Sequence, residues 1–222
     1  GINAEYGEMR SSQSPINQVN KAKCAPFGVR KQILTDFRMY YNRGDIPIIV
    51  ESLASKIQLH WKLKDRQEID LHHYLPLFFE GLRETEYPFN AIAEEGVKDL
   101  LSDGGGRIVP VIPQLIIPIK TALETRDEVV ICKVLKALQL LLDADPLVGP
   151  ALVPYYRNIL PVINIFFNKN VNIGDKVYYG QRKRQNIGDL ISETLELMEI
   201  KGGADALINI RYMIPTYSSC QQ

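Results

Sequence analysis

Apolar positions near the start of the chain alternate with polar ones. Every second residue is apolar from Ile57 to Leu63, which is typical of a half-buried β-strand. Pro47 introduces another short apolar run, Ile48–Glu51, and the five-residue link Ser52–Lys56 predicts a hairpin between the two strands. Because two strands are only marginally stable alone, we expect this hairpin to pack against helices.

From Asp70 onward the apolar spacing changes to a helical period. Asp127 is a plausible N-cap for the apolar stretch Val129–Leu142, and Gly104–Gly106 and Gly202–Gly203 are natural helix ends. The pattern predicts helices near residues 70–84, 88–102, 107–124, 127–143, 147–167, 184–200 and 203–211.

A proline-centred motif recurs within the predicted helices. Pro76, Pro118 and Pro161 each have apolar neighbours on both sides, are separated by 42 and 43 residues, and precede a second predicted helix. A period of roughly 40–47 residues with two helices per unit is typical of HEAT or armadillo repeats. The sequence therefore predicts an all-α, HEAT/armadillo-like solenoid with a short β-hairpin near its N-terminal end. An irregular helical bundle with coincidental prolines is the alternative.

The first part of the chain has no sustained period and is rich in Ser, Asn, Gln and Gly. We interpret residues 1–36 as an extended N-terminal arm and residues 37–222 as the helical-repeat domain. The chain has 26 basic and 26 acidic residues, but residues 1–35 carry a charge of +3. Such an arm can lie along an acidic partner or remain a solvated tail. Its basic residues are Arg10, Lys21, Lys23, Arg30 and Lys31.

A second basic group, Arg182, Lys183 and Arg184, ends the polar stretch Asn168–Arg182, which we interpret as an inserted loop. The group is either a contact for acidic protein tails or a solvated run of charge. The chain also has eleven tyrosines, including Tyr155-Tyr156, Tyr212 and Tyr217, and tyrosine is favoured at interfaces.

No pattern in the sequence points to catalysis or to a cofactor. The three cysteines lie far apart with no C-x-x-C pair, which argues against a zinc site or disulfide framework and favours a reducing, intracellular compartment. His72 and His73 are adjacent, so on a helix they point about 100° apart and are poorly placed to share a metal. Glycines 104–106 predict a turn. The net charge is zero, so the sequence does not predict nucleic-acid binding. It has no apolar run of 18 residues, so it predicts no membrane-spanning segment, and no secretory signal is visible.

Several long stretches resemble hallmark segments of the Parkin co-regulated gene protein family. The similarity extends over about residues 37–220 with few gaps. The segments are Phe37–Ile48 (FRMYYNRGDIPI), Leu71–Leu82 (LHHYLPLFFEGL), Pro113–Lys120 (PQLIIPIK), Ala151–Arg157 (ALVPYYR), Asn186–Ile191 (NIGDLI) and Pro215–Tyr217.

The resemblance implies a non-enzymatic, structural protein of the ciliary axoneme with a helical-repeat fold. Members of this family sit inside doublet microtubules at the inner junction, where they bridge the A- and B-tubules. Expected partners are α- and β-tubulin, a small β-rich junction protein and other microtubule inner proteins. Expected contact residues are those of the arm and the second basic group, with Tyr40 and Arg43. A soluble adaptor or scaffold for cargo transport during flagellum assembly is the alternative function.

Some animal members also bind a small meiosis-expressed protein through the segment after the tryptophan and through the glycine loop. This sequence is one residue longer between Trp61 and His72, and its glycine loop, Ser102–Gly106, lacks the histidine expected before the glycines. These two departures weaken the expectation of that partner for this chain, and the sequence leaves open whether it is bound.

Overall fold

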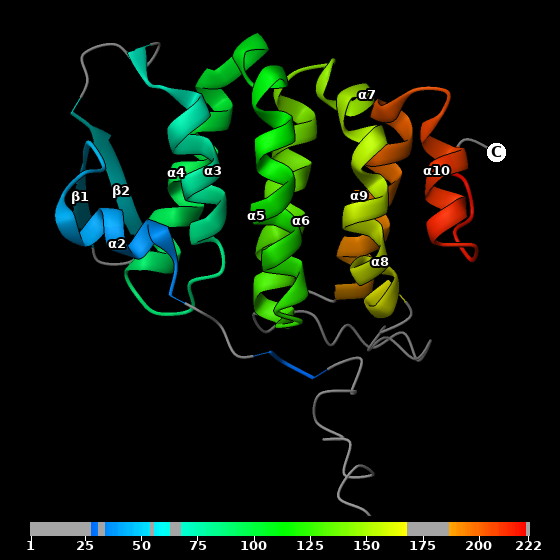
Figure 1. Cartoon of the computed structure of the whole chain (residues 1–222), viewed down its shortest axis with the longest axis horizontal. Helices are drawn as coiled ribbons and strands as arrows, with labels where there is room; N and C mark the ends of the chain where they lie inside the picture. Colours follow the sequence, from blue (N-terminus) through cyan, green and yellow to red (C-terminus); the bar gives the residue numbers. More distant parts are fainter. Residues whose placement is uncertain (1–27, 31–33, 54–55, 63–67, 168–186, 221–222) are drawn as a thin grey trace, which may run out of the picture.

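The computed structural model describes residues 28–30, 34–53, 56–62, 68–167 and 187–220. These residues are mostly helical, with a two-stranded antiparallel sheet near the N-terminal end. The elements form a row that runs from the hairpin and helix α2 at one end to helix α10 at the other (Figure 1). Most of the predicted arm, and the predicted inserted loop Asn168–Arg182, lie outside the described residues.

Helix α2 (Asp36–Arg43) was not predicted. The Thr35 side chain accepts a hydrogen bond from the Arg38 amide at its start, and Gly44 ends it in a left-handed conformation with φ 79°. The helix has eight residues and buries only Phe37. A single buried position cannot show the repeated apolar spacing from which a helix is predicted. The folded part of the chain therefore already includes Thr35 and Asp36, which the sequence analysis assigned to the arm.

The predicted hairpin is confirmed, but its predicted five-residue link is too long, because Ser52, Leu53 and Lys56 belong to the paired strands. Strands β1 (Ile48–Leu53) and β2 (Lys56–Trp61) pair antiparallel with Ile48 opposite Trp61 and Val50 opposite Leu59. Because side chains alternate between the two faces of a strand, these four apolar residues share one face. That side of β2 packs on helix α4, so the sheet is supported as two lone strands require.

Eight further α-helices lie within the described residues, near the predicted positions. Asp127 caps α6 by accepting from the Val129 amide, as predicted, and Gly105 and Gly203 follow helix ends with φ of 47° and 79°. The helices are α3 (Leu71–Gly81), α4 (Phe89–Gly104), α5 (Ile112–Glu124), α6 (Glu128–Ala144), α7 (Val148–Leu152), α8 (Tyr156–Phe167), α9 (Ile187–Gly202) and α10 (Ala206–Met213).

Two predicted helices are wrong as single elements. Residues 107–124 begin with two short 3₁₀ turns, Gly105–Arg107 and Val109–Val111, before α5 starts. Residues 147–167 divide into α7, the 3₁₀ turn Val153–Tyr155 and α8. Pro110 and Pro154 occupy the early positions of these turns. Proline has no amide hydrogen and clashes with the preceding helical turn, so it starts a helix more readily than it continues one.

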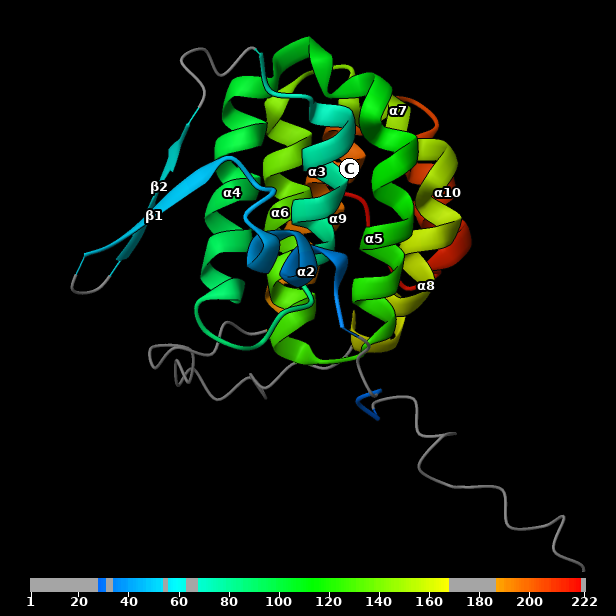
Figure 2. The same ribbon diagram turned by 60° about the vertical axis from the view of Figure 1, so that its left-hand side comes forward.

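The helices form two layers around one core. Along the row, α3 packs on α5, α5 on α8, and α8 on α10; we call these four helices the proline layer. Behind them α4 packs on α6 and α6 on α9, and we call these three the acidic layer for the charges described below. Figure 2 shows the hairpin projecting to one side of the helices. The core between the layers includes Phe78, Leu115, Leu138, Ile159 and Leu195, all essentially inaccessible to solvent.

The recurring prolines occupy equivalent places in this arrangement. Pro76, Pro118 and Pro161 lie inside α3, α5 and α8, as the sequence predicted, and all three belong to the proline layer. Each of these helices is followed along the chain by, and packs against, a helix of the acidic layer: α4, α6 and α9. The sequence period of 42 and 43 residues therefore corresponds to a repeated pair of helices.

Candidate functional site

The histidine pair at the start of α3 takes part in packing and hydrogen bonding. His72 Nδ1 lies 3.3 Å from Gln114 Nε2 of α5. The His73 ring contacts the rings of Tyr40 and Tyr74, with centroid distances of 5.6 and 4.9 Å. Within the described residues, no three His, Cys, Asp or Glu side chains are grouped closely enough to hold a metal ion.

The glycine-rich turn after α4 is organised around Arg107. Its guanidinium donates to the backbone carbonyls of Ile69 and Asp103 at 3.4 and 3.3 Å. The prediction of a turn is confirmed, although residues 105–107 form a 3₁₀ turn. The basic side chain is committed to main-chain oxygens, so the geometry gives no support for an anion cradle here.

Of the basic residues predicted to contact partners in the arm, only Arg30 lies among the described residues. Its amide donates to the carbonyl of Thr125, at the turn between α5 and α6, with an N–O distance of 2.9 Å. This bond places residues 28–30 against the turn between α5 and α6. The predicted contact residues outside the described part of the chain are Arg10, Lys21, Lys23, Lys31, Arg182, Lys183 and Arg184.

The two predicted contact residues on α2 differ in their surroundings. Tyr40 is half-buried and its ring packs edge-on against His73, so much of its surface belongs to the fold. Arg43 is exposed in the last turn, with one guanidinium nitrogen 3.9 Å from the sulfur of Met39. Arg43 is therefore available to a partner, whereas Tyr40 offers only part of its ring.

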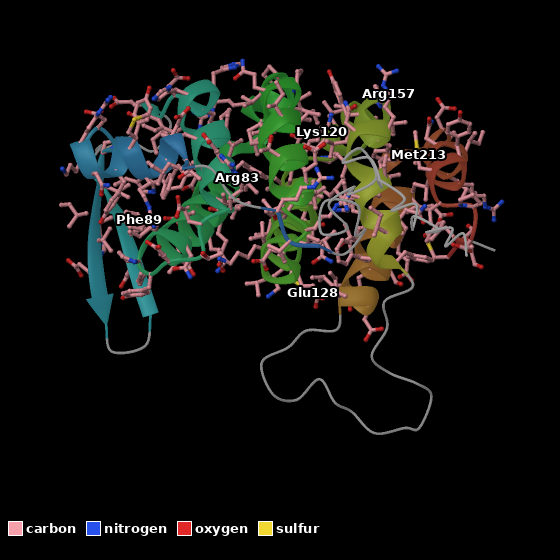
Figure 3. The ribbon with its side chains drawn as sticks, turned by 60° about the horizontal axis from the view of Figure 1, so that its bottom comes forward. Arg83, Phe89, Lys120, Glu128, Arg157 and Met213 are labelled. Carbon is pink, nitrogen blue, oxygen red and sulfur yellow. The ribbon has the colours of Figure 1, made fainter. Side chains whose placement is uncertain are left out.

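A polar network anchors α2 to the rest of the molecule. Arg38 pairs with Glu84 at 3.0 Å and with Glu86, and its guanidinium lies 4.4 Å from the centroid of the Phe89 ring. The Thr35 hydroxyl donates to Glu84. Lys133 of α6 then donates to the Glu84 carbonyl oxygen at 3.1 Å. Phe89 and neighbouring Arg83 are labelled on this part of the molecule in Figure 3. Since charge-assisted hydrogen bonds are stronger than neutral ones, the network fixes α2 to the helices that follow it.

A buried carboxylate fastens the C-terminal segment. Glu199 of α9 accepts hydrogen bonds from the Tyr217 hydroxyl at 2.7 Å, from the Ser219 hydroxyl, and from the Cys220 amide and thiol at 3.2 and 3.3 Å. Burial alone would raise the pKa of Glu199, but the hydrogen bonds outweigh that effect and lower the pKa from 4.5 to about 2. The same arrangement raises the pKa of Tyr217, through burial and then through its bond to Glu199. Nothing in the sequence pattern singled out Glu199.

Two tyrosines that were candidates for binding surfaces belong to the core instead. Tyr156 and Tyr217 are buried, and the Tyr156 hydroxyl donates to the Met198 carbonyl at 3.1 Å. Desolvation by burial raises the pKa of Tyr156. Tyr212 of α10, at 81%, is the most exposed tyrosine among the described residues. The hydroxyl groups of the buried tyrosines find protein partners, as buried polar groups must.

Cys132 is partly buried and packs against the core. Desolvation by burial raises the pKa of its thiol, which disfavours the reactive thiolate. Glu94 and Glu95 form ion pairs with Lys133 at 3.0 Å and with Lys98 at 2.8 Å, respectively. The Cys132 thiol is therefore part of the packing, and both carboxylates are engaged in ion pairs.

The two helical layers differ in charge. The proline layer has three basic and two acidic residues, whereas the acidic layer has four basic and ten acidic ones. In Figure 3, Lys120 and Arg157 of the proline layer lie toward the top, and Glu128 of the acidic layer lies at the bottom. The acidic residues of the acidic layer are Glu94, Glu95, Asp99, Asp103, Glu128, Asp143, Asp189, Glu193, Glu196 and Glu199. Sequence reasoning missed this segregation, although the repeat could have revealed it once first and second helices were grouped.

No single helix in the described part of the chain is long and apolar enough to cross a membrane. One bent pair, Phe89–Arg107 with Val109–Glu124, meets the length and hydropathy criteria when its two members are taken together, with an angle of 109° between them.

Comparison with known proteins supports the resemblance seen in the sequence. The profile of the Parkin co-regulated protein family matches residues 35–219. The Parkin coregulated gene protein homolog of Mus musculus is 55% identical over 186 residues, which cover 84% of this chain and 77% of the mouse protein. The matched region begins at Thr35, the residue that caps α2, and includes the Glu199 cluster up to Ser219. This chain belongs to the Parkin co-regulated protein family.

Proposed function

We propose that this protein is a non-enzymatic, structural microtubule inner protein of the ciliary or flagellar axoneme. It bridges the A- and B-tubules at the inner junction by binding α- and β-tubulin and a small β-rich junction protein, alongside other microtubule inner proteins. It is located in the cytoplasm as part of the axonemal cytoskeleton. The observation that carries this proposal is family membership over residues 35–219, because the resemblance implies this role.

The architecture supports a scaffold role. Three helical pairs stacked in a row, with a proline at the same place in the first helix of each, support a HEAT/armadillo-like solenoid. Such stacks present long, rigid surfaces. Contacts of modest strength, repeated at every copy along a filament, then add up to stable attachment.

The arm adds a second kind of contact in this proposal. The hydrogen bond from Arg30 to Thr125 fixes the place where the arm leaves the body. Beyond that point, Arg10, Lys21 and Lys23 provide positive charge that complements an acidic polymer. The body and the arm can therefore bind neighbouring subunits of one microtubule.

Cross-linking mass spectrometry on intact, salt-washed axonemes tests this function. We expect the protein to resist extraction and to give cross-links from Lys21, Lys23, Lys31 or Lys183 to tubulin, and from the body to a small β-rich neighbour. A detergent-soluble pool that links only to transport proteins would instead establish the soluble adaptor or scaffold. A null strain without a redundant paralogue is expected to show open or weakened doublets, and normal doublets there would contradict the structural role.

A further inference from the structure

Helix α9 has an exposed, carboxylate-rich side close to the point where the arm leaves the body. We propose that, when the protein is free of partners, a part of its own arm docks along this side of α9. The docking segment is residues 16–23, which lie outside the described residues. The inference concerns the isolated chain, so it does not depend on the proposed function.

One side of α9 is both exposed and acidic. Residues three, four or seven apart share a side of a helix, and Asp189, Glu193, Glu196 and Ile200 follow this spacing and are exposed. Leu197 lies on the same side and is half-buried. We call these five residues the α9 stripe. It has three carboxylates and no basic residue, and its last two members are close together and apolar.

Ion pairs within the acidic layer single out α9. Three carboxylates of α4 and α6 lie 2.7–3.0 Å from lysine nitrogens, in the pairs Glu94–Lys133, Glu95–Lys98 and Asp143–Lys201. Glu193 and Glu196, by contrast, form no ion pair within the described part of the chain. Two neighbouring exposed carboxylates without a counter-charge attract a basic segment more strongly than paired ones do.

The arm leaves the body beside the first turn of α9. The bond of the Arg30 amide places residues 28–30 at the turn that precedes α6. Helices α6 and α9 pack together, and Gln139 donates to the Thr194 hydroxyl at 3.1 Å. Further along both helices, Lys201 donates to Asp143 at 2.7 Å. The two helices therefore run parallel, and their first turns are neighbours.

The reach of the arm matches the position of the stripe. Lys23 and Lys21 precede residue 28 by five and seven residues, which is about 17 and 23 Å of extended chain. Glu193 and Glu196 lie six and nine residues into α9, and packed helices are about 8–10 Å apart. At about 1.5 Å per helical residue, both carboxylates are roughly 12–17 Å from the first turn of α6. Both lysines can therefore reach them.

The order of residue types in the arm also matches the order along the stripe. Away from the body, the arm presents Lys23 and Lys21 first, and the apolar Val19 and Ile16 next. Along α9 the carboxylates come first and the apolar pair follows. Residues 9–27 contain three basic residues and no acidic one. One extended segment can thus pair its charges and cover the exposed apolar end of the stripe.

Docking of the arm on its own body is autoinhibitory. Because the arm is tethered at residue 28, its effective concentration at α9 is in the millimolar range, and a contact of modest strength is enough to hold it. An acidic partner must compete with Glu193 and Glu196 for the same lysines. Such competition keeps the arm folded back until a more strongly acidic surface is present.

A pair of charge-neutralising variants tests this contact in the full chain. The test variant is Glu193→Gln with Glu196→Gln, and the control is Glu51→Gln with Glu68→Gln near the hairpin. Both change the net charge by the same amount. All four glutamates are exposed, so we expect both variants to keep the unfolding midpoint of the parent within a few degrees.

The first readout is the rate at which trypsin cleaves after Lys21 and Lys23. At low salt we expect cleavage in the test variant to be about threefold faster than in the parent and the control, with the difference vanishing as salt screens the charges. Equal rates in parent and test variant overturn the docking of the arm on α9. Acceleration in the control variant alone would move the contact to the hairpin end and contradict the assignment.

The second readout is zero-length carbodiimide cross-linking, which joins a lysine amine directly to a carboxylate. We expect products that join Lys21 or Lys23 to Glu193 or Glu196 in the purified parent. An equal mixture of isotopically light and heavy protein shows whether the two ends belong to one molecule. Products that join different molecules, or products spread evenly over all exposed carboxylates, would overturn the intramolecular contact.

Discussion

Individual side chains decide how the C-terminal end of the molecule is held. Both carboxylate oxygens of Glu199 accept hydrogen bonds. The Tyr217 hydroxyl donates to Oε2 and the Ser219 hydroxyl donates to Oε1. A buried carboxylate is tolerated only because its oxygens are satisfied in this way. The segment after α10 therefore contributes to stability although it has no regular structure.

Removing the Tyr217 hydroxyl isolates one of these bonds. We expect Tyr217→Phe to lower the free energy of unfolding by about 1.5–3 kcal/mol, because the lost bond is made to a charged group. The matched control is Tyr212→Phe at an exposed position, for which we expect no change. Urea denaturation at pH 7 measures both variants. Equal stability of the two would show that the Tyr217–Glu199 bond does not hold the segment.

The Glu199 carboxylate also predicts a pH dependence. Its pKa is lowered from 4.5 to about 2 on folding, so its contribution is complete above pH 4.5 and is lost as the pH falls toward 2. Glu199→Gln has no such titration. We expect this variant to be less stable than the parent at pH 7 and the gap to narrow between pH 4.5 and 2. A gap that stays constant over that range would exclude Glu199 as the source of acid sensitivity.

At the scale of elements, helix ends differ in how well they are capped. The Asp127 side chain accepts from the Val129 amide at 2.9 Å and satisfies one of the unpaired amides at the start of α6. Asp205 precedes α10 in the same position but makes no side-chain capping bond. The two aspartates therefore allow a comparison between an N-cap residue that makes the capping hydrogen bond and one that does not.

Replacing each aspartate with alanine tests this difference. We expect Asp127→Ala to lower the free energy of unfolding by about 1 kcal/mol, the usual value of an N-cap. We expect Asp205→Ala to change it by less than about 0.5 kcal/mol, as for an ordinary surface site. Thermal unfolding followed by circular dichroism measures both, and an equal loss would mean that helix-dipole effects outweigh the capping bond.

For the whole molecule, the position of the boundary between arm and body matters most. Thr35 is buried, caps α2 and donates to Glu84, which pairs with Arg38. A cut after residue 36 therefore damages the body, whereas a cut after residue 27 spares these contacts. The family profile begins at residue 35 and therefore agrees with a body that includes Thr35 and Asp36.

Two truncations separate binding by the arm from folding of the body. We expect removal of residues 1–27 to keep the unfolding midpoint within about 2 °C and to weaken incorporation into doublets. Removal of residues 1–36 costs a cap and a buried hydrogen bond, about 2 kcal/mol together, which lowers the midpoint by roughly 4–8 °C. Differential scanning calorimetry compares them. Loss of cooperative unfolding on removing residues 1–27 would contradict the arm assignment.

The amino-acid sequence alone determined the elements whose signals are local. The hairpin followed from alternation, most helices from a sustained apolar period, the α6 cap from Asp127, and the repeated pairs from prolines at a fixed spacing. The family also followed, because long segments resemble it. Where proline competed with the apolar period, at Pro110 and Pro154, the pattern overestimated helix length, since one missing amide hydrogen outweighs favourable spacing.

Only the tertiary structure decided the features that join distant parts of the chain. Helix α2 is stabilised by the bonds of Thr35 and Arg38 to Glu84, far along the sequence, so its eight residues show no strong pattern by themselves. The hydrogen bonds to Glu199 form only because the segment after α10 packs back against α9. The separation of a carboxylate-rich layer from a layer with few charges appears only when alternate helices are packed side by side. Local signals set the elements, whereas burial and charge complementarity between elements set the surfaces on which function depends.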